Sequence, residues 1–226
     1  MQSTIFTVSP NALDVPIIDT QRAAQVLRQD LDGAKIYLLR QVMLPSECKA
    51  LIAQAEALGF SRAGLAIGDD QYRVNERARN NLRVIIESAT LAAALWGRVR
   101  GCVTIKHEGA TAVGVNERFR VYKYEAGHHF SPHYDLRNQL PQGETRCSFV
   151  IYLSEGFLGG GTRFFEEKSK SSRRGQERGR KFNNQPRLCA KPPIGGAVVF
   201  DHLLLHEGEQ VTSGVKYAMR TDVVYR

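Results

Sequence analysis

The sequence has few cysteines and no long apolar run. Only four of its 226 residues are cysteine, Cys48, Cys102, Cys147 and Cys189, and none forms a C-x-x-C pair. Disulfide-rich folds need cysteines at high density in a short chain, so we expect reduced and mostly buried thiols. No segment approaches the ~18 consecutive apolar residues of a membrane span, and residues 1–16 lack a signal-peptide pattern. We therefore expect a cytoplasmic protein, or a nuclear one in a eukaryote, with no membrane partner.

Nucleotide-binding motifs and internal repeats are also missing. Gly159-Gly160-Gly161 is not followed by Lys and Ser or Thr, so we expect a turn rather than a phosphate-binding loop. At roughly 150 residues per domain the length favours a single domain. With 42% hydrophobic and 24% charged residues, the composition is that of a globular protein and excludes a disordered chain, a coiled coil or a collagen-like fibre.

Acidic residues are the minority, and the basic excess is concentrated in one segment. The chain has 31 Lys and Arg against 23 Asp and Glu, a formal charge of +8. Residues 166–191 hold nine of these basic residues and three Glu, so this segment carries +6 and the other 200 residues carry +2. We interpret residues 166–186 as a flexible basic insertion. A solvated loop is the favoured role, and a clamp for nucleic acid or an acidic protein is the alternative, although base-stacking aromatics are lacking.

Three helices are predicted in the first half of the chain, at residues 20–31, 45–59 and 88–99. Each begins at a capping residue and repeats apolar side chains at helical spacing, and the first two end at or near a glycine. A short strand is expected at residues 36–39. Residues 61–81 are polar without a sustained period, so we expect a loop there, which is either an ordinary exposed loop or one that contacts the substrate.

Short β runs separated by Gly and Pro predominate from Arg118 onward. These runs are residues 119–124, 147–153, 162–165, 197–200 and 217–225. Helices followed by many short strands predict an α+β, mainly β fold in which helices pack on a β-sandwich or barrel. We expect one domain over residues 1–226, with residues 1–117 as helical support and substrate loop and residues 118–226 as the β core.

A His-x-Asp pair, His133-Tyr134-Asp135, is the strongest chemical signal in the residues themselves. On an extended chain, residues two apart face the same side, so the imidazole and the carboxylate can converge. Two His and one carboxylate on one face of an octahedral ion form the facial triad of non-haem Fe(II) oxygenases. The third ligand must come from elsewhere, and His202 and His206 are both candidates. Alone, the pair is also consistent with a surface His beside an Asp.

A cation on the last β run adds to this pattern. Lys216 follows His206 by ten residues, and a cosubstrate with a distal carboxylate needs a cation at a fixed distance from the metal. A single Lys on a strand more often faces solvent. The combination of spacings favours the functional interpretation.

Taken together, these segments resemble the 2-oxoglutarate- and Fe(II)-dependent dioxygenases of the prolyl 4-hydroxylase type. The resemblance covers about residues 118–225 and, more loosely, extends back to Ile36. It is carried by VYKYEAGHHFSPHYD at 121–135, FVIYL at 149–153, GGTRF at 160–164, PIGGAVVF at 193–200 and HEGEQVTSGVK at 206–216.

The resemblance implies a double-stranded β-helix, or jelly roll, with N-terminal helices buttressing one sheet. It makes His133, Asp135 and His206 the Fe(II) ligands and leaves His202 a structural role. It further implies that Lys216 binds the distal carboxylate of 2-oxoglutarate. Tyr124 and Thr162 match residues that line the same pocket. Arg220, on the same face as Lys216, is either a second anchor or a partner for Asp222.

The implied reaction hydroxylates an unactivated C–H bond with O2, and releases succinate and CO2. Its implied cofactors are Fe(II) and the cosubstrate 2-oxoglutarate, with L-ascorbate as a further candidate. A dry apolar wall is needed beside the metal. We expect it from residues that alternate along the strands, namely Phe149, Ile151, Leu153, Phe164, Val198 and Phe200.

The substrate is the least constrained part of this interpretation. A prolyl or other residue of a protein is the favoured substrate, a free amino acid or other small molecule is the alternative, and a non-catalytic binding module is the third hypothesis. Collagen-like substrates are not favoured, because the only tryptophan, Trp96, lies in a predicted helix and position 222 is Asp.

Overall fold

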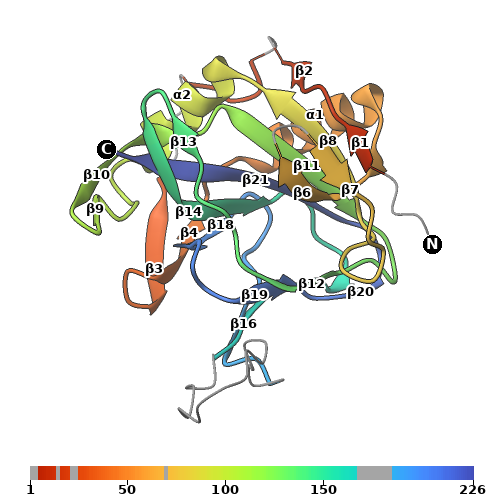
Figure 1. Ribbon diagram of the computed structural model, residues 1–226. Helices are drawn as coiled ribbons and strands as arrows, with labels where there is room; N and C mark the ends of the chain where they lie inside the picture. Colours follow the sequence, from red (N-terminus) through yellow and green to blue (C-terminus); the bar gives the residue numbers. More distant parts are fainter. Residues whose placement is uncertain (1–4, 14–15, 21–24, 69–70, 167–184) are drawn as a thin grey trace.

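Two facing β-sheets and two helices form the body of the protein in the computed structural model (Figure 1). It describes residues 5–13, 16–20, 25–68, 71–166 and 185–226. The predicted basic insertion therefore lies almost entirely outside the described residues. No helix among the described residues is long and apolar enough to cross a membrane.

The larger sheet, called the major sheet below, forms the centre of the molecule. Its strands lie in the order β2 (Asn11–Ala12), β8 (Leu82–Glu87), β11 (Arg118–Tyr124), β21 (Lys216–Tyr225), β14 (Gly143–Tyr152), β18 (Ala197–Asp201), β4 (Ile36–Arg40) and β3 (Leu27–Asp32). Four further strands join it at the sides: β5 (Ser61–Arg62), β9 (Lys106–His107), β10 (Ala110–Val115) and β13 (Gln139–Leu140). All its pairings except β2 with β8 are antiparallel.

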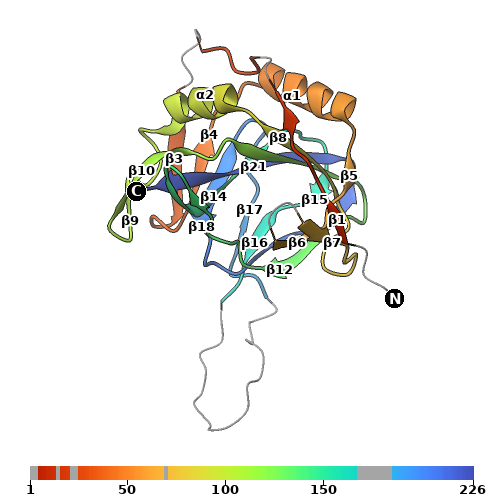
Figure 2. The same cartoon turned by 45° about the horizontal axis from the view of Figure 1, so that its top comes forward.

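A smaller sheet, the minor sheet, faces the major sheet on the side away from the helices (Figures 1 and 2). It contains β12 (Phe130–His133), β19 (His206–Gly208), β16 (Thr162–Phe164) and β17 (Leu188–Ala190) in that order. Two further groups are β1 (Ile5–Thr7), β7 (Gln71–Arg73) and β6 (Leu65–Gly68), and the pair β15 (Leu158–Gly159) and β20 (Val211–Ser213).

Both helices cover the outer face of the major sheet, and their ends follow from local sequence. In α1 (Pro45–Leu58), proline occupies the first turn, and the Glu47 carboxylate accepts a 2.7 Å hydrogen bond from the backbone N–H of Leu44. Gly59 ends the helix with φ 84°. In α2 (Ala89–Val99), the Ser88 hydroxyl accepts from the N–H of Leu91 at 3.2 Å. The second and third predicted helices are thereby confirmed.

The first predicted helix and the predicted loop are corrected by the structure. Residues 27–32 form strand β3, which pairs with β4, so the predicted helix at residues 20–31 is wrong there. Residues 61–81 contain β5, β6 and β7 rather than one continuous loop, and β8 follows directly. Backbone pairing with distant strands stabilises these segments, and no local periodicity reveals such pairing. The N-terminal half therefore supplies strands as well as helices.

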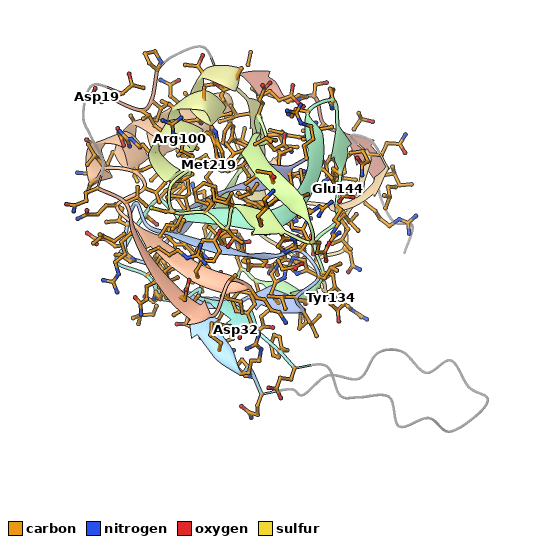
Figure 3. All side chains as sticks on the ribbon, turned by 90° about the vertical axis from the view of Figure 1, so that its left-hand side faces the viewer. Asp19, Asp32, Arg100, Tyr134, Glu144 and Met219 are labelled. Carbon is orange, nitrogen blue, oxygen red and sulfur yellow. The ribbon has the colours of Figure 1, made fainter. Side chains whose placement is uncertain are left out.

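The two faces of the major sheet have different surroundings. The outer face packs against α1 and α2 in one large apolar cluster, and Met219 is among the side chains that fill it (Figure 3). The inner face and the minor sheet share a smaller cluster that includes Tyr122, Tyr124 and Tyr152. This alternation follows from strand geometry, since successive side chains point to opposite faces.

The predicted apolar wall is only half correct. Phe164, Val198 and Phe200 lie in the cluster between the two sheets. Three other members of the predicted wall belong to the helix-facing cluster: Phe149, Ile151 and Leu153. The alternation along β14 is as predicted, but the side chains that point between the sheets are Ser148, Val150 and Tyr152. Periodicity shows that a strand has two faces and does not show which face meets which layer.

Candidate active site

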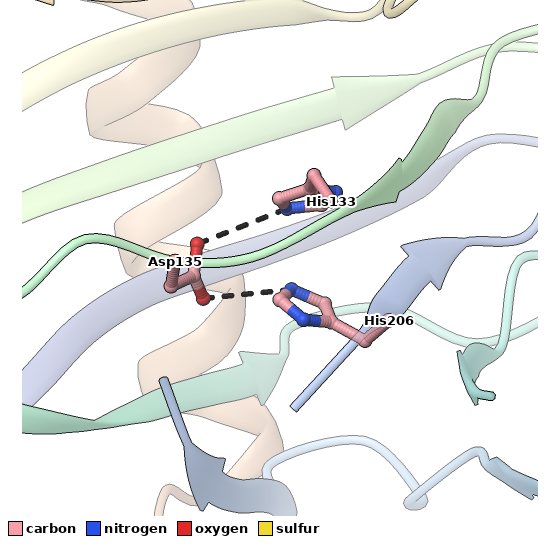
Figure 4. A group of neighbouring side chains, drawn as sticks. All are labelled: His133, Asp135 and His206. Atoms are coloured by element: carbon pink, nitrogen blue, oxygen red, sulfur yellow. Dashed lines mark ion pairs between the residues drawn. The ribbon is translucent and has the colours of Figure 1, made fainter. Parts of the chain in front are cut away.

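Two histidines and one aspartate converge between the sheets (Figure 4). His133 at the end of β12 pairs directly with His206 at the start of β19. Asp135 lies two residues after His133 in the chain. His133 Nε2 lies 3.7 Å from Asp135 Oδ1, and His206 Nε2 lies 3.4 Å from Asp135 Oδ2. One ligand-type atom from each side chain lies within 4.8 Å of the other two. The sequence spacing had placed two of these groups together, and the β12–β19 pairing adds the third.

Backbone carbonyls fix the proton on each histidine ring. His133 Nδ1 lies 2.8 Å from the Ser131 carbonyl, and His206 Nδ1 lies 2.9 Å from the Leu204 carbonyl. A carbonyl only accepts, so each Nδ1 carries the hydrogen. Nε2 then bears the lone pair in the neutral ring, and both lone pairs face the Asp135 carboxylate.

This donor set fits a cation. Burial lowers the pKa of His133 and of His206, which favours neutral imidazoles. Asp135 is buried; burial alone would raise its pKa, but the Arg220 guanidinium holds it well below its usual range. Two lone pairs and a carboxylate facing one another repel unless a positive ion lies between them. Two imidazoles and one carboxylate are the ligand set of non-haem Fe(II) sites.

Two further side chains hold the Asp135 carboxylate. The Ser148 hydroxyl donates to Oδ2, and the Arg220 guanidinium donates to Oδ1. Ser148 and Arg220 come from β14 and β21, which pair in the major sheet. Sequence analysis missed Ser148, because nothing local shows which face of β14 points inward. Such second-layer hydrogen bonds orient a metal ligand.

His202 lies apart from the converging group. It is fully buried, and its Nε2 lies 3.3 Å from Asp222 Oδ1. The same carboxylate oxygen accepts from Arg220 Nε and Nη2 at 3.2 and 2.9 Å. Of the two roles considered for Arg220, the contact with Asp222 is the one observed.

Lys216 is a buried cation without a carboxylate partner among the described residues. Its side chain lies inside the barrel, and Nζ donates to the Gly160 carbonyl at 2.6 Å. The ammonium lies 4.2 Å from the Tyr152 ring centroid and 5.2 Å from that of Tyr124. Burial lowers the pKa of Lys216 to about 7. A buried ammonium with one neutral acceptor is well suited to receive a carboxylate.

The other two predicted pocket residues lie beside this lysine. Tyr124 is directly opposite Lys216 in the β11–β21 pairing. The Thr162 hydroxyl is 2.9 Å from the Tyr152 hydroxyl, and Tyr152 also contacts the Gly160 carbonyl at 3.3 Å. Tyr152 was not predicted as a pocket residue and was hidden among the apolar residues of β14. These side chains form one polar end of the space between the two sheets.

A stack of side chains supports His133 on another side. The Phe130 ring stacks on the His133 ring with centroids 3.6 Å apart, and the Arg79 guanidinium lies 4.0 Å from the Phe130 centroid. The segment that carries Arg79 is bonded to the strand that carries Phe130, since Ser131 N–H donates to the Ala78 carbonyl at 2.7 Å. Residues 75–82 are thus attached to the strand that presents His133.

A second group of metal-binding residue types is already neutralised by arginines. His107 Nε2 lies 2.9 Å from Asp201 Oδ2, and Glu108 is close to both. Arg137 makes a 2.8 Å ion pair with Glu108, and Arg146 approaches the same carboxylate at 3.8 Å. This group therefore functions as a surface ion-pair network.

Comparison with known proteins shows which family this chain is similar to. Residues 119–221 match the family described as the 2OG-Fe(II) oxygenase superfamily, where 2OG is 2-oxoglutarate. A curated relative, probable prolyl 4-hydroxylase 9 of Arabidopsis thaliana, is 27% identical over 188 residues. The match covers 76% of this chain and spans 62% of the length of that relative.

Solved structures of prolyl hydroxylases share the fold. A Trichoplax adhaerens prolyl hydroxylase in complex with a hypoxia inducible factor peptide gives a TM-score of 0.61 at 15% identity, covering 86% of this chain and 85% of its own. A Pseudomonas putida prolyl-4-hydroxylase gives 0.56 at 16% identity, covering 87% and 96%. The predicted α+β, mainly β fold, a double-stranded β-helix with buttressing helices, is confirmed.

Fold and site together define a double-stranded β-helix protein with a convergent His-Asp-His group. Over residues 119–221 the chain matches the 2OG-Fe(II) oxygenase superfamily, and in sequence it resembles a prolyl 4-hydroxylase. The name of this superfamily refers to Fe(II) and 2-oxoglutarate, and the His133, Asp135 and His206 group is chemically suited to hold such a metal.

Proposed function

We propose that the chain is a 2-oxoglutarate- and Fe(II)-dependent dioxygenase that hydroxylates a prolyl residue of a protein. The observation that carries this proposal is the group of two neutral imidazoles and a carboxylate, in the same interior as a buried lysine that has no carboxylate partner among the described residues. Bound Fe(II) and 2-oxoglutarate supply the oxidising chemistry that inserts an oxygen atom of O2 into a C–H bond, with release of succinate and CO2.

His133, Asp135 and His206 would hold the Fe(II). The carbonyls behind both Nδ1 atoms keep the Nε2 lone pairs directed at the site. Ser148 and Arg220 keep the Asp135 carboxylate from rotating. These three side chains would supply only part of the coordination of an Fe(II) ion, so the metal could also hold the cosubstrate.

Lys216 would bind the distal carboxylate of 2-oxoglutarate. On binding, the ammonium would exchange a neutral carbonyl partner for a charged one, which makes a shorter and stronger hydrogen bond. Tyr124 and Thr162 would line the same pocket beside Lys216. Phe164, Val198 and Phe200 exclude water on the sides that the cosubstrate does not contact.

The substrate assignment rests on the relatives. The Trichoplax adhaerens enzyme has been solved with a peptide, and the Arabidopsis thaliana relative carries a prolyl 4-hydroxylase name. A protein substrate is therefore favoured over a free amino acid. We include L-ascorbate as a reductant that maintains Fe(II), and a cytoplasmic location, as further parts of the proposal.

Succinate formation tests the reaction class directly. Purified protein with Fe(II), 2-oxoglutarate and O2 is expected to form succinate slowly without substrate, and faster with prolyl peptides, which should gain the mass of one oxygen atom. The His206→Ala variant is the matched control. Absence of succinate from the unsubstituted protein under all these conditions would favour the non-catalytic binding module.

A further inference from the structure

Two buried arginines lack a carboxylate partner among the described residues. Arg79 is 5% exposed and Arg83 is 4% exposed. The Arg79 guanidinium donates only to the Asn81 side-chain oxygen, at 3.1 and 3.0 Å. Arg83 Nη2 is buried without any hydrogen-bond acceptor, and its guanidinium lies 4.0 Å from the Tyr72 ring centroid. Buried guanidinium groups are normally paired with an anion, because removing them from water is costly.

These arginines belong to a larger basic region on the inner face of the major sheet. In the β11–β8 pairing, Arg83 is directly opposite Tyr122. In the β11–β21 pairing, Arg120 is directly opposite Arg220. Arg79 lies 5.2 Å from the Tyr122 ring centroid. Four guanidinium groups thus surround one buried tyrosine. We call Arg79, Arg83, Arg120, Arg220 and Tyr122 the arginine cluster.

The two carboxylates near the arginine cluster already pair with Arg220 or Arg120. Asp222 accepts from Arg220 and lies 3.6 Å from Arg120, and Asp135 accepts from Arg220. Among the described residues, Arg79 and Arg83 therefore have no carboxylate that neutralises their positive charge. Burial, with Arg79 as a neighbouring cation, lowers the pKa of Arg83 to about 10, so the guanidinium stays charged at neutral pH. A cluster of this kind attracts an anion.

A cavity gives access to one side of the cluster. A space of about 320 Å³, which is within the usual size of ligand sites, lies between residues 62–82 and residues 125–128, with Arg79 in its wall. The acidic side chains that line it have cationic partners, since Glu76 is paired with Arg62 and Glu125 lies 4.0 Å from Lys123. Of the two arginines among the described residues that line this cavity, Arg79 is therefore the one without a carboxylate partner.

The arginine cluster is close to the proposed metal ligands and separate from Lys216. Phe130 stacks on His133, and Arg79 contacts the same ring, so a single aromatic ring lies between the guanidinium and the imidazole. Lys216 and Arg220 are four residues apart on β21, which at about 3.3 Å per residue is roughly 13 Å.

We propose that the arginine cluster binds a carboxylate side chain of the substrate, so that the preferred peptide carries Asp or Glu near the residue that is hydroxylated. This inference rests on the proposed function. The Arg79 guanidinium and the His133 imidazole are separated by the ring of Phe130. About two residues of extended peptide span such a distance, at 3.3–3.6 Å per residue. The acidic residue should therefore lie about two positions from the oxidised one. The cluster then selects an acidic peptide, while Fe(II) and Lys216 hold the cosubstrate.

Paired peptides test this inference. A set of prolyl peptides would carry Asp at each position from three before to three after the proline, and each has a partner with Asn at that position. Binding to the Fe(II) and 2-oxoglutarate complex under anaerobic conditions is measured by fluorescence anisotropy. At the preferred position we expect the Asp peptide to bind about tenfold or more tightly than the Asn peptide, since a charged acceptor strengthens the hydrogen bonds. Arg83→Gln and Arg79→Gln should each reduce this ratio to near one.

Control variants separate the possible outcomes. Arg83→Lys keeps the charge and should keep part of the preference, and Arg40→Gln removes an exposed arginine on β4 and should keep all of it. Equal binding of Asp and Asn peptides at every position would refute the inference, and so would binding of a free amino acid but of no peptide. Succinate formed by the unsubstituted enzyme before any peptide is added tests the proposed function separately.

Discussion

The outer and inner faces of the major sheet are built from the same strands and differ in almost every chemical respect. The outer face contributes fully or nearly fully buried apolar side chains: Val84, Ile86, Phe119, Val121, Phe149, Ile151, Met219 and Val223. The inner face contributes polar, charged and aromatic side chains: Arg83, Arg120, Tyr122, Tyr124, Ser148, Tyr152, Lys216, Arg220 and Asp222. One residue along a strand is enough to pass from one chemistry to the other.

This difference separates stability from chemistry. The outer face and the two helices bury a continuous apolar area, which stabilises the fold. The inner face buries charges that are costly without partners, and the stable outer layer holds these charges in place. Substitutions on the outer face should therefore change unfolding, and substitutions on the inner face should change binding and turnover.

The proposed ligands should show the largest effect. His133→Ala, Asp135→Ala and His206→Ala should each lower 2-oxoglutarate turnover by more than about 100-fold, because even outer-layer partners of a metal site are worth about 10–100-fold. Succinate formation measures the loss, and circular dichroism checks that the fold remains. His202→Ala, which removes only the contact with Asp222, should keep most activity. An inactive His202→Ala beside an active His206→Ala would reverse the ligand assignment.

Phe149→Ala tests the opposite face of the sheet. Phe149 is fully buried against the helix-facing cluster, and deleting such a ring costs about 3–5 kcal/mol of unfolding free energy. Denaturant titration should show this loss. The 2-oxoglutarate KM of the folded fraction should stay within about twofold of that of the unsubstituted protein. Such a change is well below 1.4 kcal/mol of binding free energy, which would change KM about tenfold. A large change in KM with unchanged stability would mean that this face contributes to the site.

Lys216→Ala tests the cosubstrate anchor. Truncating one partner of a buried charge pair costs about 2–5 kcal/mol, so the 2-oxoglutarate KM should rise by about 30-fold or more. Initial rates of succinate formation at varied 2-oxoglutarate give the value. An unchanged KM would transfer the anchor role to Arg220.

The pH dependence of cosubstrate binding should follow the ammonium of Lys216. Burial places its pKa at about 7, so the free enzyme loses this charge as pH rises through 7. The 2-oxoglutarate KM should therefore rise with pH, by about fivefold between pH 7 and pH 8, because binding requires the protonated form. In Lys216→Arg the charge persists at all these pH values. A rise of the same size in that variant would assign the effect to another group.

Tyr124→Phe and Thr162→Val should have the smallest effects. Each removes a single hydroxyl next to Lys216, and one neutral hydrogen bond is worth about 0.5–1.5 kcal/mol. The 2-oxoglutarate KM should rise by about two- to tenfold. Because Thr162 also contacts Tyr152 at 2.9 Å, its variant should in addition unfold at slightly lower denaturant concentration. Equal stability of the two variants would contradict that second role.

Local signals predicted the parts of this protein that depend on neighbouring residues. Helix α1 was predicted from Pro45 and Gly59, which start and stop a helix wherever they lie in the fold. The His133 and Asp135 pair was predicted because two residues on a strand share a face. The ten-residue spacing from His206 to Lys216 and the surrounding motifs then gave the family, and the family gave the third ligand.

The strands at residues 27–32 and 61–87 depended on distant partners and were predicted wrongly or missed. β3 is a strand because β4 pairs with it, and β8 is central because β11 lies beside it. In each case the decisive hydrogen bonds join residues far apart in the chain, and helical or loop-like composition does not prevent them.

The sequence alone predicted the fold class and the pair His133 and Asp135, because these depend on spacing along the strands, and the resemblance to a known family implied the cosubstrate chemistry and the third ligand. Only the tertiary structure decided which face of β14 points inward, and it thereby placed Ser148 rather than Phe149 beside Asp135. It also left Arg79 and Arg83 buried without a carboxylate partner among the described residues. The physical reason is that a side chain's partners are set by the packing of layers, which a period of two along a strand does not contain.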